Sequence, residues 1–232
     1  MLTAFRFYCP ITQWLECLTH NEKVVGSIPT RATSLNNMEA KTKRVQDSLN
    51  SKEVEKFLDL YLYKDPTKIE RVNDKVRQLM GIDVIYNNMF IDEKCALDYI
   101  NKPLSTFSME ISSINKSGNR YDGWLINEKL ATTHYLFCYI NSCEVDENPL
   151  CENIKEMEVI LVSKKKIIGF IEENCDKLSE IVRISKSING SHNYKGFRII
   201  QSKHKVESPI NILIKRDDLR QMSVASKIIK PL

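Results

Sequence analysis

The sequence predicts an α+β or α/β protein with a central mixed β-sheet and flanking helices. Two observations support this fold class. Short runs rich in β-branched and aromatic residues recur between residues 81 and 214, and segments with apolar residues at helical spacing lie before and between them. With 232 residues, 42% hydrophobic, and only 7 Gly and 7 Pro, the chain has enough apolar material for one sizeable core.

The first 37 residues differ from the rest because they show no clear helical or strand pattern. Their run Gly26-Ser-Ile-Pro-Thr-Arg31 resembles the translated 3′ half of a transfer-RNA gene. We expect residues 1–37 to be non-native read-through or a disordered arm, with Met38 as the native start. Residues 38–232 then form a single domain, with a core at about 68–140 and a basic part at about 158–232.

Two helical segments are expected ahead of the first strands. The first begins near Ser51, which can cap a helix, and has apolar residues at helical spacing from Val54 to Tyr61. A second apolar face runs from Ile69 to Leu79. Both segments would cover the sheet.

The stretch from Gly81 to Lys94 predicts a β-hairpin. Two runs rich in β-branched and aromatic residues flank Asn87-Asn88, and asparagine tolerates the positive φ angles that a two-residue turn requires. In this register Asp83 lies directly opposite Asp92 on the neighbouring strand.

This register gathers charge on one face of the hairpin. The Cβ atoms of Asp83 and Asp92 would lie ~5 Å apart, and two charges at that distance repel by roughly 3 kcal/mol at an effective dielectric of about 20. Because side chains alternate along a strand, Lys94 projects from the same face as Asp92, whereas Glu93 points the other way. Paired carboxylates of this kind favour a hard divalent cation.

Asp83, Asp92 and Lys94, with Glu93 as spacer, resemble the motif of the PD-(D/E)XK nuclease superfamily. The proline of that motif is absent, and Ile82 stands in its place. The resemblance covers about residues 68–140 and implies a restriction-endonuclease-like core. It also implies hydrolysis of phosphodiester bonds in DNA with Mg²⁺ or Mn²⁺, in which Asp83 and Asp92 are metal ligands and Lys94 polarises the attacking water or the phosphate.

Nucleases of this superfamily often present one more acidic side chain from a helix ahead of the hairpin. Glu55, Glu70 and Asp74 are the candidates here, and an ordinary solvated position is the alternative for each. The alternating stretch Thr106–Ser112 predicts a strand. If that strand neighbours the Asp92 strand, Glu110 could also reach the metal, and a polar solvent face is its alternative.

The remainder of the chain alternates further strands with helices. The expected elements are strands at 121–126, 132–140, 159–162, 197–201 and 210–214, and helices at 164–173 and 176–184. Basic residues surround the last two strands. We expect Lys203, Lys205 and Lys215 to contact nucleic-acid phosphates.

Composition and charge limit the partners and the cellular location that we expect for the protein. The net charge of +4, from 34 basic and 30 acidic residues, permits nucleic-acid binding without requiring it. No stretch approaches the ~18 apolar residues of a membrane span, and seven cysteines without a Cys-x-x-Cys pair indicate reduced thiols. We therefore expect a cytoplasmic protein whose partner is nucleic acid, DNA first, with a homodimer left open.

Two alternatives stay open at this point. The first is an RNA-directed or structure-selective nuclease on the same core. The second is a catalytically inactive nucleic-acid-binding module on the same fold. Spacing does not disclose a recognition sequence, because base readout depends on loops that the sequence does not place.

Overall fold

The computed structural model describes residues 46, 48–65, 67–114, 117–145, 149–185, 190–201 and 209–231. The chain divides into two compact units, Met1–Arg44 and Val45–Leu232, and every described residue belongs to the second. The predicted segment 1–37 and the expected start at Met38 lie outside the described residues.

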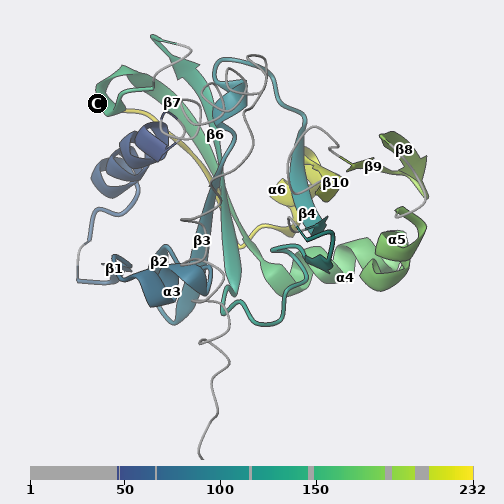
Figure 1. Ribbon diagram of the computed structural model, residues 1–232. Coiled ribbons are helices and arrows are strands. Elements are labelled where there is room, and N and C mark those ends of the chain that lie inside the picture. Colours follow the sequence, from purple (N-terminus) through teal and green to yellow (C-terminus); the bar gives the residue numbers. More distant parts are fainter. Residues whose placement is uncertain are drawn as a thin grey trace, which may run out of the picture. The chain divides into compact units, whose positions relative to one another are not determined.

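The central sheet is mixed and has six strands in the order β1-β2-β3-β6-β7-β11 (Figure 1). Strands β3 and β6 run parallel, and all other neighbours in this sheet run antiparallel. The strands are β1 (Ile69–Arg71), β2 (Val84–Tyr86), β3 (Met89–Cys95), β6 (His134–Cys143), β7 (Ile154–Ser163) and β11 (Ala225–Ile229). The predicted α+β fold with a central mixed sheet is confirmed.

A second sheet, which the sequence did not predict, is antiparallel and has the order β5-β4-β10-β9-β8. Its strands are β4 (Thr106–Ile114), β5 (Arg120–Asp122), β8 (Ser191–Tyr194), β9 (Phe197–Gln201) and β10 (Ile210–Lys215). Strand β4 therefore belongs to a different sheet from the Asp92 strand.

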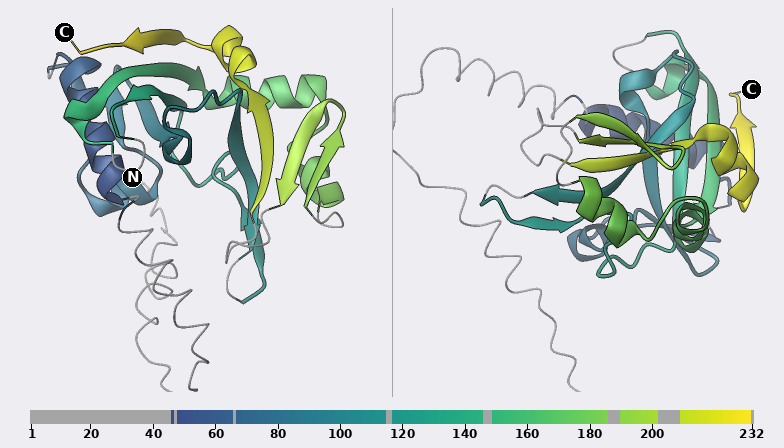
Figure 2. Two further views of the ribbon diagram at one scale, coloured as in Figure 1. Left: turned by 90° about the horizontal axis from the view of Figure 1, so that it is seen from above. Right: turned by 90° about the vertical axis from the view of Figure 1, so that its right-hand side faces the viewer.

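Helices pack against both sheets. They are a helix through residues 48–61, α3 (Lys75–Leu79), α4 (Lys164–Asn174), α5 (Leu178–Ser185) and α6 (Arg216–Met222), with short 3₁₀ turns η1 (Leu97–Tyr99) and η2 (Cys151–Asn153). Helix α4 contacts β7 of the central sheet, and α5 contacts β4 of the second sheet (Figure 2). Within the described part of the chain, no helix combines the length and the apolar character that a membrane crossing needs.

Both faces of the central sheet are buried. On β6, alternate side chains from Tyr135 to Tyr139 pack into a core shared with the second sheet and with α4, α5 and α6. The intervening side chains, from Leu136 to Ile140, pack into a core shared with the helix of residues 48–61. This double burial explains why the strand is apolar on both faces. The neighbouring strand β3 consequently presents one face to each core.

The β2–β3 hairpin has the predicted turn and register. Asn87 and Asn88 have φ angles of 46° and 63°, and Val84 pairs with Ile91. Gly81, at φ +74°, starts the hairpin, and a Cβ atom there would lie only 2.5 Å from the Thr132 hydroxyl oxygen. Only glycine fits this approach and this backbone conformation without strain.

Several element boundaries differ from the predictions. Ser51 lies inside its helix and does not cap it, and residues 69–71 form a strand where a helix was expected. Strand β5 ends at Asp122. Strand β7 begins at Ile154, earlier than expected, and the elements α6 and β11 were not predicted.

Candidate active site

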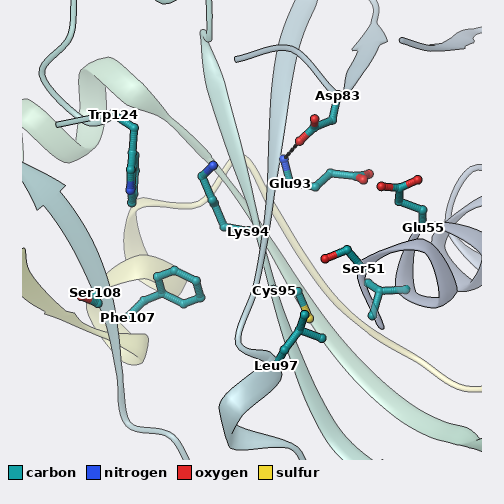
Figure 3. Close-up of a pocket in the computed structure, with 11 residues that line it drawn as sticks. Ser51, Glu55, Asp83, Glu93, Lys94, Cys95, Leu97, Phe107, Ser108 and Trp124 are labelled. Carbon is teal, nitrogen blue, oxygen red and sulfur yellow. Dashed lines mark hydrogen bonds between the residues drawn. The ribbon is translucent and has the colours of Figure 1, made fainter. Parts of the chain in front are cut away.

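The candidate site lies where β3 extends beyond its hairpin partner. Strand β2 pairs with residues 89–91 of β3, while residues 91–95 pair with β6 on the other side. A cavity of about 330 Å³ opens beside this part of β3 (Figure 3). Its walls come from the helix of residues 48–61, from the hairpin, and from β4 with the turn after β5: Ser51, Val54, Glu55, Asp83, Glu93, Lys94, Cys95, Leu97, Phe107, Ser108 and Trp124.

Asp92 and Lys94 form an ion pair on one face of β3. The Asp92 Oδ1 atom lies 2.7 Å from Lys94 Nζ, and the two side chains are 7% and 28% exposed. Asp92 pairs with Tyr135 of β6, so this face of β3 looks toward the core between the two sheets. The predicted same-face arrangement of Asp92 and Lys94 is thus present.

The carboxyl group of Asp92 interacts with that of Asp83. Burial raises the pKa of Asp92 to about 6, and the charge and hydrogen bond of Lys94 act in the opposite direction. The charge of Asp83, and a hydrogen bond between the two carboxyl groups, raise the Asp92 pKa further. The two carboxyl groups therefore meet just beyond the last residue pair of the β2–β3 ladder, Val84 with Ile91.

Asp83 lies immediately before β2 and extends the hairpin with its side chain. Its backbone N–H donates to the Ile91 carbonyl at 2.9 Å. Its Oδ2 atom accepts from the Glu93 backbone N–H at 2.8 Å (Figure 3). The carboxylate is thereby fixed against the β3 backbone at the wall of the cavity.

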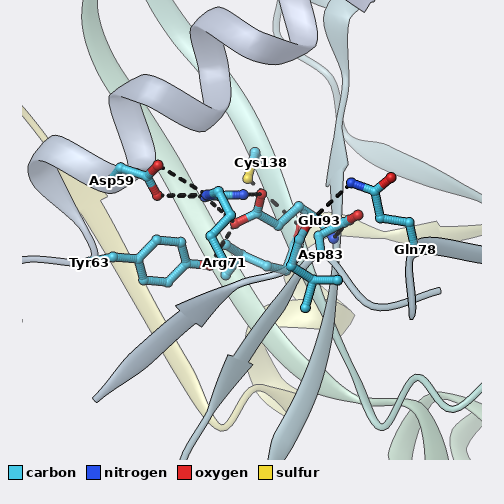
Figure 4. Close-up of polar contacts among 9 residues, drawn as sticks. Asp59, Tyr63, Arg71, Gln78, Asp83, Glu93 and Cys138 are labelled. Carbon is cyan, nitrogen blue, oxygen red and sulfur yellow. Dashed lines mark hydrogen bonds and ion pairs between the residues drawn. The ribbon is translucent and has the colours of Figure 1, made fainter. Parts of the chain in front are cut away.

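Glu93 lies on the opposite face of β3 from Asp92 but also lines the cavity, and a network of polar groups holds its carboxylate (Figure 4). The Tyr63 hydroxyl donates to Glu93 Oε1 at 2.7 Å, and Arg71 Nη1 donates to Oε2 at 3.0 Å. Arg71 also binds Asp59 at 2.7 Å. Burial raises the pKa of Glu93, against the effects of Arg71 and Tyr63. This network anchors the strand that carries Asp92 and Lys94.

Of the three helix-side acids considered, the structure places Glu55 at the cavity. Burial raises the pKa of Glu55, the charge of Arg71 opposes this, and the charge of Asp83 adds to it. Figure 3 shows the Glu55 carboxylate directed toward the β3 side of the cavity. The sequence indicated Glu55 as one of three candidate acids. It could not show which of the three lies at the site, because that depends on how the helix of residues 48–61 packs against the sheet.

Glu70 does not line the cavity, so the structure does not bring this predicted residue to the candidate site. It lies on β1, the outermost strand of the central sheet, and its half-exposed side chain pairs with Arg77. Asp74 is also elsewhere, because its carboxylate accepts the Arg77 backbone N–H at the start of α3.

The proposal that Glu110 reaches the metal depended on β4 lying next to the Asp92 strand. That condition is not met: Glu110 pairs with Asn211 of β10 in the second sheet. Its neighbours Phe107 and Ser108 line the cavity instead. The prediction fails because the sequence did not reveal a second sheet.

Two of the three predicted phosphate-binding lysines, Lys203 and Lys205, lie outside the described residues. Lys215 is exposed at the end of β10, opposite Thr106 of β4, and is not part of the cavity wall. Its expected role in binding nucleic acid remains a prediction.

Asp83 and Asp92 offer carboxylate oxygens, the kind of ligand that Mg²⁺ takes in proteins. Within the described ranges, no group of three or more His, Cys, Asp or Glu side chains is assembled to hold a metal ion. Mg²⁺ characteristically keeps several waters and is held by one or two carboxylates. The adjoining Asp83 and Asp92 supply two such carboxylates. Asp83, Glu55 and Glu93 line the cavity, and Asp92 does not.

Comparison of the chain with protein-family models, with curated proteins and with solved structures gives no match.

Proposed function

We propose that this protein is a Mg²⁺-dependent nuclease that hydrolyses phosphodiester bonds in DNA and resembles restriction endonucleases. The observation that supports the proposal is the meeting of the Asp83 and Asp92 carboxyl groups beside the Lys94 ammonium. Asp83 and Lys94 line the cavity, whereas Asp92 is buried next to it and is not part of its wall. A buried carboxyl group beside a second, partly exposed acid is costly to maintain without a function, because burial and like charge both disfavour its ionisation.

Asp83 and Asp92 would hold Mg²⁺, which when bound supplies positive charge for the attacking oxygen and for the phosphate. Lys94, only 28% exposed, would donate a hydrogen bond to a phosphate oxygen or orient the attacking water. Its charge acts strongly because part of its surroundings is apolar. Each of these roles uses a side chain that the hairpin fixes in place.

Glu55 has a position from which it could accept a hydrogen bond from water in the cavity. Its raised pKa brings it nearer to the range where a carboxylate accepts and returns a proton. The residue lies on the helix ahead of the hairpin, the region from which the PD-(D/E)XK resemblance implies a further acidic group. Glu55 therefore replaces Glu70 and Glu110 as the third acidic residue of the proposal.

A nucleic-acid-binding module without activity is the second candidate. The observation in its favour is that the described residues gather only a two-carboxylate centre and no larger cluster of ligands. An RNA-directed or structure-selective nuclease would share the proposed residues, so substrate choice has to be measured directly.

The test is incubation of the protein with plasmid, linear duplex, single-stranded DNA and RNA, in Mg²⁺, Mn²⁺ or EDTA. We expect metal-dependent cleavage of DNA, and its loss in Asp92→Asn. Asp122→Asn is the matched control, because Asp122 is an exposed aspartate on β5 and does not line the cavity. Binding of DNA without cleavage in any metal would favour the inactive module instead, and cleavage confined to RNA would favour the RNA-directed alternative.

A further inference from the structure

The Lys94 ammonium has contacts from two separate parts of the chain. Its Nζ atom lies 2.7 Å from Asp92 Oδ1 on its own strand and 5.3 Å from the centre of the Trp124 indole ring. Trp124 belongs to the turn after β5, and both Lys94 and Trp124 line the cavity (Figure 3). Attraction between an ammonium group and the face of an indole is a recognised electrostatic contact at this distance.

The indole is held in place from behind. The Tyr135 ring lies 4.8 Å from the Trp124 ring at an interplanar angle of 63°, and the Tyr135 hydroxyl donates to the Trp124 carbonyl at 3.0 Å. Tyr135 is fully buried and pairs with Asp92 across β3 and β6. The paired strands β3 and β6 therefore hold both partners of Lys94: Asp92 directly, and Trp124 through Tyr135.

The turn that carries Trp124 is also packed closely. A Cβ atom on Gly123 would lie 2.5 Å from the Glu110 carbonyl oxygen, so only glycine allows this approach to β4. The Leu125 N–H donates to that same Glu110 carbonyl at 3.1 Å. Trp124 is thus flanked by two chain neighbours, Gly123 and Leu125, whose backbone is held against Glu110 of β4.

We propose that Trp124 is a positioning residue that keeps the Lys94 ammonium in the cavity when Asp92 serves as a metal ligand. If Asp92 held a cation, its carboxylate would be shared and the cation would repel Lys94, which would weaken the ion pair that holds Lys94 in the metal-free protein. The indole face is uncharged and remains available to Lys94. This inference rests on the proposed nuclease function and adds a role for a residue outside the acidic pair.

The kinetic test compares Trp124→Leu with Trp124→Phe in the full chain. Trp124→Leu removes the ring and should lower kcat by about 3- to 30-fold with little change in KM for Mg²⁺ or for DNA. Trp124→Phe keeps an aromatic face and should recover most of that loss. Melting temperatures of both variants show whether either change acts through folding.

A spectroscopic test measures the contact itself without relying on catalysis. The chain has two tryptophans, Trp14 and Trp124, so Trp14→Phe leaves Trp124 as the single emitter. In that background Lys94→Met removes the charge over the indole and should shift the metal-free emission spectrum. Lys129→Met, in the same loop and exposed, is the matched control and should leave the spectrum unchanged.

The outcomes separate the two proposals. If the native chain cleaves no nucleic acid with Mg²⁺ or Mn²⁺, the proposed function is overturned and the catalytic role of Trp124 with it. If the native chain cleaves and Trp124→Leu turns over as fast, the positioning role alone is overturned. An emission spectrum unaffected by Lys94→Met would overturn the contact on which that role depends.

Discussion

The backbone N–H of Glu93 donates a 2.8 Å hydrogen bond to the carboxylate of Asp83, the residue that precedes β2. One carboxylate therefore fixes the backbone between Asp92 and Lys94 and also meets the Asp92 carboxyl group. Asp83 therefore has a structural role, accepting the Glu93 N–H, and a proposed chemical role as a metal ligand. Different substitutions of Asp83 can remove one role and keep the other.

Asp83→Asn and Asp83→Ala should differ in stability while both lose cleavage. The asparagine carbonyl oxygen can still accept the Glu93 N–H, whereas alanine leaves this donor without its partner, at a cost of about 1–3 kcal/mol in the free energy of unfolding. Urea denaturation of both variants in EDTA checks this difference. Equal stability of the two variants would show that the hydrogen bond contributes nothing.

The metal-free protein should become less stable as pH rises through the Asp92 transition. The pKa of Asp92 in the folded protein is about 6, above the ordinary value of 3.8. Between about pH 4 and pH 6 the unfolded chain releases this proton while the folded protein keeps it, so unfolding becomes easier. The loss attributable to Asp92 is about 2 to 3 kcal/mol.

Asp92→Asn removes this titration, and groups that do not interact with Asp92 cancel when the two proteins are compared. The groups that act on Asp92 electrostatically are Asp83 and Lys94, and it in turn affects Tyr135 and Lys164. The unfolding free energy of the native chain minus that of Asp92→Asn, measured in EDTA, should fall from pH 4 to pH 7. A constant difference would contradict the buried, protonatable state of Asp92.

Lys94→Ala should lose cleavage and also lose stability in EDTA at pH 8. The change leaves the Asp92 carboxylate, 7% exposed, without its ion-pair partner. Mg²⁺ should largely restore the melting temperature, because a ligand that binds only the folded state stabilises it. Lys102→Ala, an exposed lysine away from the cavity, is the control and should respond to Mg²⁺ as the native chain does. A destabilised Lys94→Ala variant that Mg²⁺ does not rescue would argue against a metal at the acidic pair.

Glu93→Gln should lower stability without abolishing cleavage. Arg71 would lose an ion-pair partner that is 9% exposed while keeping Asp59, and breaking a buried ion pair typically costs about 3 kcal/mol. The face that carries Asp92 and Lys94 is unchanged. Cleavage by the folded protein at low temperature, measured beside chemical denaturation, checks both parts. Loss of cleavage with unchanged stability would mean that Glu93, and not Asp92, is the metal ligand.

The hairpin could be predicted from the sequence because its determinants are local. Asn87 and Asn88 supply the positive φ angles, and alternation fixes which of Asp92, Glu93 and Lys94 share a face. The acidic pair and its lysine followed from that register. The charge pattern on this face thus needed no knowledge of the rest of the fold.

Features that depend on long-range pairing could not be predicted in the same way. Strand β4 pairs with β10, which lies far along the chain, and an apolar run does not indicate which sheet a strand joins. Residues 69–71 form the outer strand by pairing with β2, which overrides their helical spacing. For the same reason the expected approach of Glu110 to the metal did not hold. The choice of Glu55 among the candidate acids, and the contact of Trp124 with Lys94, also could not be predicted from the sequence.

The most direct test of the central claim is the rate of DNA cleavage at saturating enzyme as a function of Mg²⁺ concentration. The native chain, Asp92→Asn and Asp122→Asn would be compared in matched buffers. We predict a rate that rises with Mg²⁺ and saturates in the native chain and in Asp122→Asn, and that stays at the EDTA background in Asp92→Asn. Equal Mg²⁺-dependent rates in Asp92→Asn and the native chain would contradict the account.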